Sequence, residues 1–145
     1  MTFRASVRRV LLERYATFSG RASRSEFWWF VLFCFAASFV LSFLERLFTG
    51  GEPGNGLLGA IFSLAALIPS LAVSVRRLHD IDRTGWWLLL GLVPLVGVIV
   101  LLIFYVLPGT PGANRFGSNP KDGDGSGRLE PAEPIPSSLI PRVPR

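Results

Sequence analysis

Three long stretches without a charged residue constrain this chain more than any other feature of its sequence. Residues 27–44, 57–75 and 86–107 contain no Asp, Glu, Lys, Arg or His. As helices that rise about 1.5 Å per residue, they would be roughly 27–33 Å long. That length matches a bilayer hydrocarbon core of about 30 Å, and a small water-soluble domain has no place for three such segments. The sequence therefore predicts a membrane protein.

The fold class that we expect is all-α. An integral membrane helical bundle of three transmembrane helices should occupy a domain of residues 21–117, with spans at about 24–48, 57–78 and 85–107. The second span is rich in small residues, which let helix backbones approach closely, so we expect it at the centre of the bundle.

The two ends of the chain differ from this domain. Apolar residues recur at helical spacing in the first twenty residues while most arginines lie off that stripe, which predicts an amphipathic helix over 1–20 in the inner-leaflet interface. A cytoplasmic helix packed on the second loop is the alternative. Residues 118–145 are rich in Pro and Gly, and we expect a disordered tail there.

Basic residues predict the orientation. Residues 1–26 and the second loop, 76–85, carry nine arginines, whereas the first loop, 45–56, and the twenty residues after the third run carry three Arg or Lys. The positive-inside rule then places the N-terminus and the second loop in the cytoplasm and the C-terminus outside. Pro94 and Gly97 interrupt the third run, so a re-entrant fold that returns the tail to the cytoplasm is the alternative.

The second loop is the densest polar cluster and contains His79, the only histidine. Arginine can hold a lipid phosphate by paired hydrogen bonds. The candidates for lipid or phosphate contact are Arg21, Arg24, Arg76 and Arg77. Imidazole titrates near neutrality, and carboxylates beside it can share a proton or a divalent metal. The candidates for that chemistry are His79, Asp80 and Asp82. The alternative is a topology signal with a helix cap and local salt bridges.

Two further patterns involve pairing or ion binding. Ser23 followed by Glu26 fits a capping box at the start of the first span. In the tail, acidic and hydroxyl side chains fall at the spacing of a calcium loop. These residues are Asp122, Asp124, Ser126, Glu130 and Glu133. Nearby prolines forbid the flanking helices of an EF-hand, so an ordinary linker is the alternative. We expect no other cofactor.

Three segments together resemble a known family. They are residues 20–28, residues 76–80 with Gly85-Trp86-Trp87, and residues 109–117. Their order and spacing resemble a bacterial family of small inner-membrane proteins, known only as a domain of unknown function numbered eight hundred and five. The resemblance implies a bacterial plasma membrane and a multi-span helical fold. It supplies no activity, ligand or assigned site.

No nucleophile elbow or intramembrane carboxylate pair points to an enzyme or a proton-driven pump. We therefore expect a non-enzymatic protein whose arginine-rich cytoplasmic face contacts anionic lipid or a membrane protein partner, including a second copy of the chain, and not nucleic acid. One alternative is a small oligomeric transporter or channel with His79 and Asp80 at its inner mouth. Another is a lipid-headgroup enzyme at the same loop.

Overall fold

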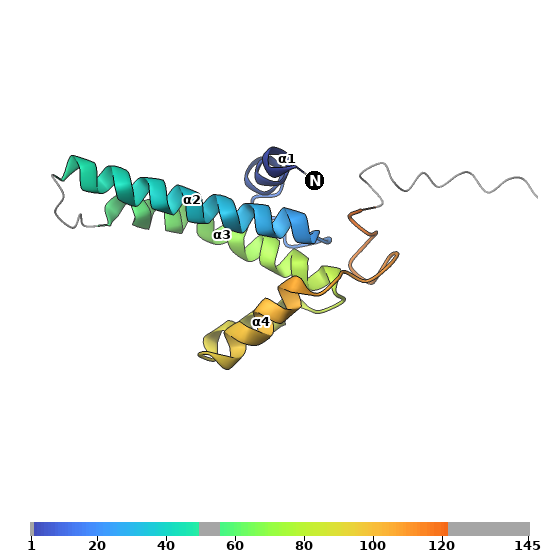
Figure 1. Ribbon diagram of the computed structural model, residues 1–145. Helices are drawn as coiled ribbons and strands as arrows, with labels where there is room; N and C mark the ends of the chain where they lie inside the picture. The colour runs from blue at the N-terminus through green and yellow to red at the C-terminus, as the bar shows by residue number, and fades with distance from the viewer. Residues whose placement is uncertain (1, 50–55, 122–145) are drawn as a thin grey trace, which may run out of the picture.

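The computed structural model describes residues 2–49 and 56–121, and within these ranges its regular elements are helices (Figure 1). We call the region formed by the N-terminus of α2 (Arg24–Phe48) and the C-terminus of α3 (Leu57–Asp80) the polar end of the molecule. In chain order, the elements are α1 (Phe3–Arg8), the π-helical turn η1 (Arg9–Glu13), α2 (Arg24–Phe48), α3 (Leu57–Asp80), the 3₁₀ segment η2 (Gly85–Leu92) and α4 (Val96–Val106).

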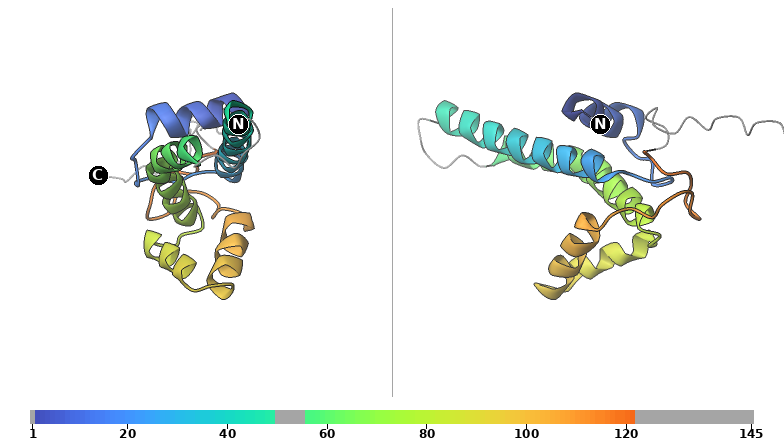
Figure 2. Two further views of the ribbon diagram at one scale, coloured as in Figure 1. Left: turned by 90° about the vertical axis from the view of Figure 1, so that its left-hand side faces the viewer. Right: turned by 45° about the vertical axis from the view of Figure 1, so that its right-hand side comes forward.

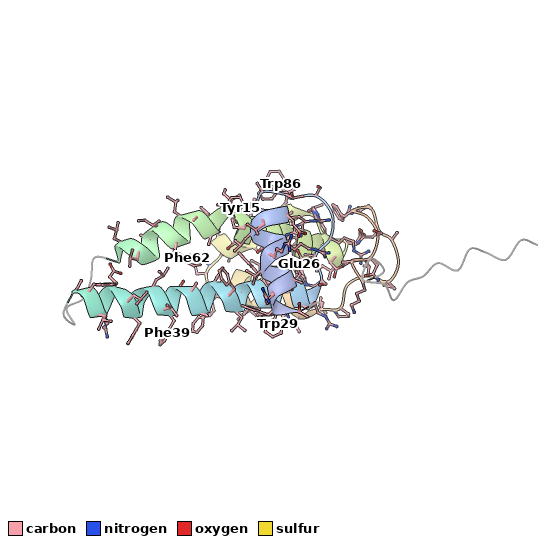
Figure 3. The ribbon with its side chains drawn as sticks, turned by 90° about the horizontal axis from the view of Figure 1, so that it is seen from above. Tyr15, Glu26, Trp29, Phe39, Phe62 and Trp86 are labelled. Carbon is pink, nitrogen blue, oxygen red and sulfur yellow. The ribbon has the colours of Figure 1, made fainter. Side chains whose placement is uncertain are left out.

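Helices α2 and α3 lie side by side and run in opposite directions (Figure 1). Both are long and apolar enough to cross a membrane, by length and composition. Away from the polar end, most of their large apolar side chains are exposed, and Phe39 points outward from α2 (Figure 3). In water such surfaces would be costly, whereas in hydrocarbon they need no further cover.

The third apolar run differs from its prediction. The continuous helix expected over 85–107 does not form, because the run divides into η2 and α4, each about 16 Å long. The chain reverses at Pro94 and Leu95, where Leu95 has a φ of 63°. Gly97 is required at this reversal, because a β-carbon there would overlap the Leu90 carbonyl oxygen. The structure therefore contains two candidate spans and a shorter apolar hairpin, and three spans are not established.

The N-terminal segment crosses over α2 and α3 near the polar end (Figures 2 and 3). Its Val10 is buried against Phe27, Phe30 and Val73, which form the apolar core. The Tyr15 hydroxyl donates a 2.5 Å hydrogen bond to a backbone carbonyl of α3. The helix that we expected on the membrane surface is thus packed against both long helices.

Candidate functional site

The polar end contains a buried ion pair between the two long helices. Arg76 of α3 donates to the Glu26 carboxylate of α2 at 2.6 Å, and the side chains are 0% and 1% exposed. Arg9 of η1 approaches the other Glu26 oxygen at 3.9 Å. Figure 3 shows Glu26 at the point where the N-terminal segment crosses α2 and α3. A charge in such a position requires its partner, so the pair fixes how α2 and α3 meet.

Ser23 caps α2 directly before this pair. Its side chain accepts a 3.3 Å hydrogen bond from the backbone N–H of Glu26. The Glu26 carboxylate is directed to Arg76 across the helix interface. The motif therefore places one helix cap and one interhelical ion pair within four residues.

A second ionic group centres on Asp80. Its carboxylate accepts from Arg21 at 2.9 Å and from Arg77 at 2.5 Å, and all three side chains are buried. Both arginines also bind the segment that follows α4. Arg21 donates to the carbonyls of Thr110 and Gly112, each at 2.6 Å. We call Arg21, Arg77, Asp80 and the backbone of residues 105–112 the Asp80 clasp.

Arg77 completes the clasp at the end of α4. It donates to the carbonyl of Tyr105 at 3.2 Å and also to the carbonyl of Leu107. These oxygens belong to the last turn of a helix, where carbonyls lack intrahelical partners. A cation at a helix C-terminus is further favoured by the helix dipole. The clasp therefore holds the end of the apolar hairpin against the end of α3.

The segment after the hairpin is fixed by neutral contacts as well. Thr110 donates to the Asp80 carbonyl through its N–H at 2.8 Å and its hydroxyl at 3.1 Å. Asn114 donates to the His79 carbonyl at 2.8 Å. The His79 ring stacks on Phe116 with centroids 3.8 Å apart, and its Nδ1–H donates to the Gly20 carbonyl at 3.1 Å. All three sequence motifs thus meet at the polar end.

The four arginines suggested for lipid contact separate into two kinds. Arg21, Arg76 and Arg77 are buried and hydrogen-bonded within the protein. These internal contacts give Arg21, Arg76 and Arg77 a structural role. Arg24 is exposed and makes one long 3.4 Å contact with the Val106 carbonyl. It borders a shallow depression of about 500 Å³ that includes Trp28 and Trp29.

The residues suggested for proton or metal chemistry do not converge. Asp80 faces Arg21 and Arg77, whereas Asp82 pairs with Arg115 at 3.1 Å near the surface. Among residues 2–49 and 56–121, no group of three or more His, Cys, Asp or Glu side chains is placed to hold a metal ion. The suggested calcium loop, Asp122 to Glu133, lies outside the described residues.

The sequence did not point to several residues of this end. Tyr105 and Thr110 contribute backbone carbonyls, which no side-chain motif reveals. Arg9 and Arg14 line a polar pocket with Arg21, although the sequence suggested that they belong to a surface helix. The only signal for Thr110 was its place in the third motif.

Apart from the contacts of Arg9 and Arg14, the residues of this site fall within one family match. A protein-family model described as "Protein of unknown function (DUF805)" matches residues 15–118, which include both carboxylates and all three motifs. The chain belongs to this family. The resemblance drawn from the motifs is confirmed.

Similar bacterial proteins agree with this assignment. The chain is similar to inner membrane protein YhaH of Escherichia coli strain K12, with 43% identity over 115 residues, or 77% of this chain and 93% of that protein. It is also similar to inner membrane protein YhaI of the same strain, with 41% identity over 113 residues, or 78% and 93%. Uncharacterized protein YiiR is 30% identical over 135 residues, covering 73% of this chain and 87% of that protein. No solved structure matches. The chain is therefore a member of a family of bacterial inner-membrane proteins of unknown function.

Proposed function

We propose that this chain is a non-catalytic inner-membrane protein that contacts anionic lipid headgroups through exposed arginines at its polar end. The observation that carries the proposal is the position of the four tryptophans, which include every tryptophan in the sequence. They are exposed and lie near the start of α2 or of η2, both next to the polar end: Trp28, Trp29, Trp86 and Trp87. Tryptophan is enriched where hydrocarbon meets headgroups.

Exposed arginines accompany both tryptophan pairs. Arg24 borders the depression that contains Trp28 and Trp29. Arg83 is exposed, and its guanidinium lies 5.2 Å from the centre of the Trp87 ring. A basic residue near an anionic membrane surface contributes about 1 kcal/mol to binding. Arg24 and Arg83, rather than the buried arginines of the Asp80 clasp, are therefore the proposed lipid contacts.

The proposed orientation puts the polar end in the cytoplasm. Residues 107–121 follow α4 at the same end as the Asp80 clasp, which supports the re-entrant alternative over an outward tail. With Arg115 and Lys121 on that side, basic residues in the short flanks number eleven against one, Arg46. That asymmetry agrees better with the positive-inside rule than the nine against three of a third span.

Quenching of tryptophan fluorescence by brominated lipid tests the lipid contact. The full chain is reconstituted in phosphatidylcholine vesicles that contain the same mole fraction of either brominated phosphatidylglycerol or brominated phosphatidylcholine. Because all four tryptophans lie near the polar end, their quenching reports which lipid gathers there. We expect stronger quenching by the anionic lipid, with the difference reduced at high salt.

A double variant and a matched control identify the contacts. Arg24→Gln with Arg83→Gln should remove most of the preference for anionic lipid, with each sample normalised to its fluorescence in unbrominated vesicles. Arg46→Gln changes an exposed arginine at the opposite end of α2 and should keep the preference. Equal quenching of the unchanged chain by the two brominated lipids would refute the proposed function.

A further inference from the structure

The interior of the polar end holds more positive than negative charge. Five arginines lie in or beside it, against the two carboxylates of Glu26 and Asp80. They are Arg9, Arg14, Arg21, Arg76 and Arg77. Within residues 2–49 and 56–121, no carboxylate lies within ion-pair distance of Arg14. Counted over the described residues, the five arginines carry three more charges than these two carboxylates.

Arg76 adds a second sign of an incomplete site. Its Nη1 donates to Glu26, while its Nε and Nη2 are buried without a hydrogen-bond partner in the described part of the chain. Charged donors left unpaired in a protein interior are costly, and such groups call for an explanation. Arg9 and Arg14 lie close enough for their charges to oppose that of Arg76. An additional negative charge near these three side chains would relieve both problems.

A pocket opens beside Arg9 and Arg14, and Arg76 is not among its described lining residues. Its volume is about 250 Å³, well above the ~30 Å³ share of one water molecule. One wall consists of Arg9, Arg14, Gly20 and Arg21, and the other consists of residues 116–120. None of its described lining residues is Asp or Glu, and its second wall offers the side chains of Ser118 and Asn119. Among the described residues, the pocket thus brings together the guanidinium groups of Arg9 and Arg14 and the positive charge of Arg21, whose own donors already bind Asp80 and backbone carbonyls.

We propose that this pocket binds a phosphate-bearing anion. Planar guanidinium groups pair with phosphate through two parallel hydrogen bonds, which strengthens and orients the contact. An excess of three positive charges is better balanced by a phosphate dianion than by a single carboxylate. The phosphate can come from free phosphate or its small esters, or from a lipid headgroup. This site is distinct from the exposed contacts of Arg24 and Arg83 and does not depend on them.

Calorimetric titration of the purified full chain in non-ionic detergent tests the site at constant ionic strength. The titrants are inorganic phosphate, a short-chain phosphatidylglycerol below its micellar concentration, and acetate. We expect saturable binding of at least one phosphate compound and affinity for acetate at least tenfold weaker. Binding of phosphate but not of phosphatidylglycerol assigns a soluble ligand, whereas the reverse assigns a headgroup.

Matched variants connect the binding to the pocket. Arg14→Gln removes a pocket guanidinium that has no described carboxylate partner, and it should weaken phosphate binding at least tenfold. Arg4→Gln, an exposed arginine on α1 outside this pocket, should bind as the unchanged chain does. Arg14→Lys keeps the charge but loses the paired geometry, so an intermediate affinity is expected, and this variant serves if Arg14→Gln does not fold.

The inference fails if the unchanged chain shows no saturable phosphate binding, or if the Arg14→Gln and Arg4→Gln variants bind phosphate with equal affinity. Acetate binding as tight as phosphate binding would also overturn it. The double variant Arg24→Gln with Arg83→Gln should bind phosphate in the calorimeter as the unchanged chain does, because neither side chain lines this pocket. Failure of this pocket and failure of the surface contact are therefore separate outcomes.

Discussion

Substitution of Asp80 by asparagine isolates the electrostatic part of the Asp80 clasp. The change removes a negative charge while keeping the size of the side chain. The backbone contacts of Asp80 with Thr110 do not depend on its carboxylate. What is lost is the partner of two buried arginines, Arg21 at 2.9 Å and Arg77 at 2.5 Å. We expect the end of the hairpin to separate from α3 and the protein to lose stability.

The magnitude follows from burial. Removing one partner of a buried ion pair costs roughly 3–5 kcal/mol, because a charge remains in the interior without compensation. Arg21 and Arg77 each keep at least two backbone carbonyls as acceptors, which places the expected cost near the lower bound, about 3 kcal/mol. Asp82, two residues away, provides a matched control. Its pair with Arg115 is about half exposed, so Asp82→Asn should cost only ~0–1 kcal/mol.

Reversible unfolding in mixed detergent micelles, followed by circular dichroism, compares the two variants. A difference of about 2 kcal/mol in the free energy of unfolding corresponds to a roughly 30-fold change in the equilibrium constant. If Asp80→Asn and Asp82→Asn shift the unfolding midpoint equally, the buried carboxylate does not hold the hairpin and the reasoning fails.

Three further predictions follow from other contacts. Glu26→Gln should destabilise the chain by about 3–5 kcal/mol in the same assay, because buried Arg76 would lose its carboxylate; an unchanged midpoint would contradict this. Gly109→Ala should speed proteolysis of residues 107–117, because a β-carbon there would overlap the Asp80 carboxylate, whereas Gly59→Ala, with open space around it, should not. A compartment-sensitive reporter fused to the C-terminus should give a cytoplasmic signal. A periplasmic signal would contradict the re-entrant hairpin and support a C-terminus outside the cytoplasm.

The apolar runs and the helix start at Ser23 were accessible to sequence reasoning because each depends on local patterns. Hydrophobic length predicts α2 and α3, and a hydroxyl residue three positions before Glu26 predicts the cap. The division of the third run was harder to predict, since its composition is that of a span. The reversal depends on the close approach of Gly97 to the Leu90 carbonyl, where a β-carbon would not fit, and hydropathy does not record such backbone packing.

The position of the buried arginines explains why their chemistry was the least predictable part of the site. In an exposed loop, guanidinium groups would be available to phosphate, and the sequence suggested that use. In the structure, Arg21 and Arg77 donate hydrogen bonds to Asp80 and to backbone carbonyls of residues 105–112. That arrangement requires the hairpin to come back to the polar end. A third helix crossing the membrane would carry those carbonyls away and leave both arginines underpaired. The Asp80 clasp and the reversal of the third apolar run therefore depend on each other.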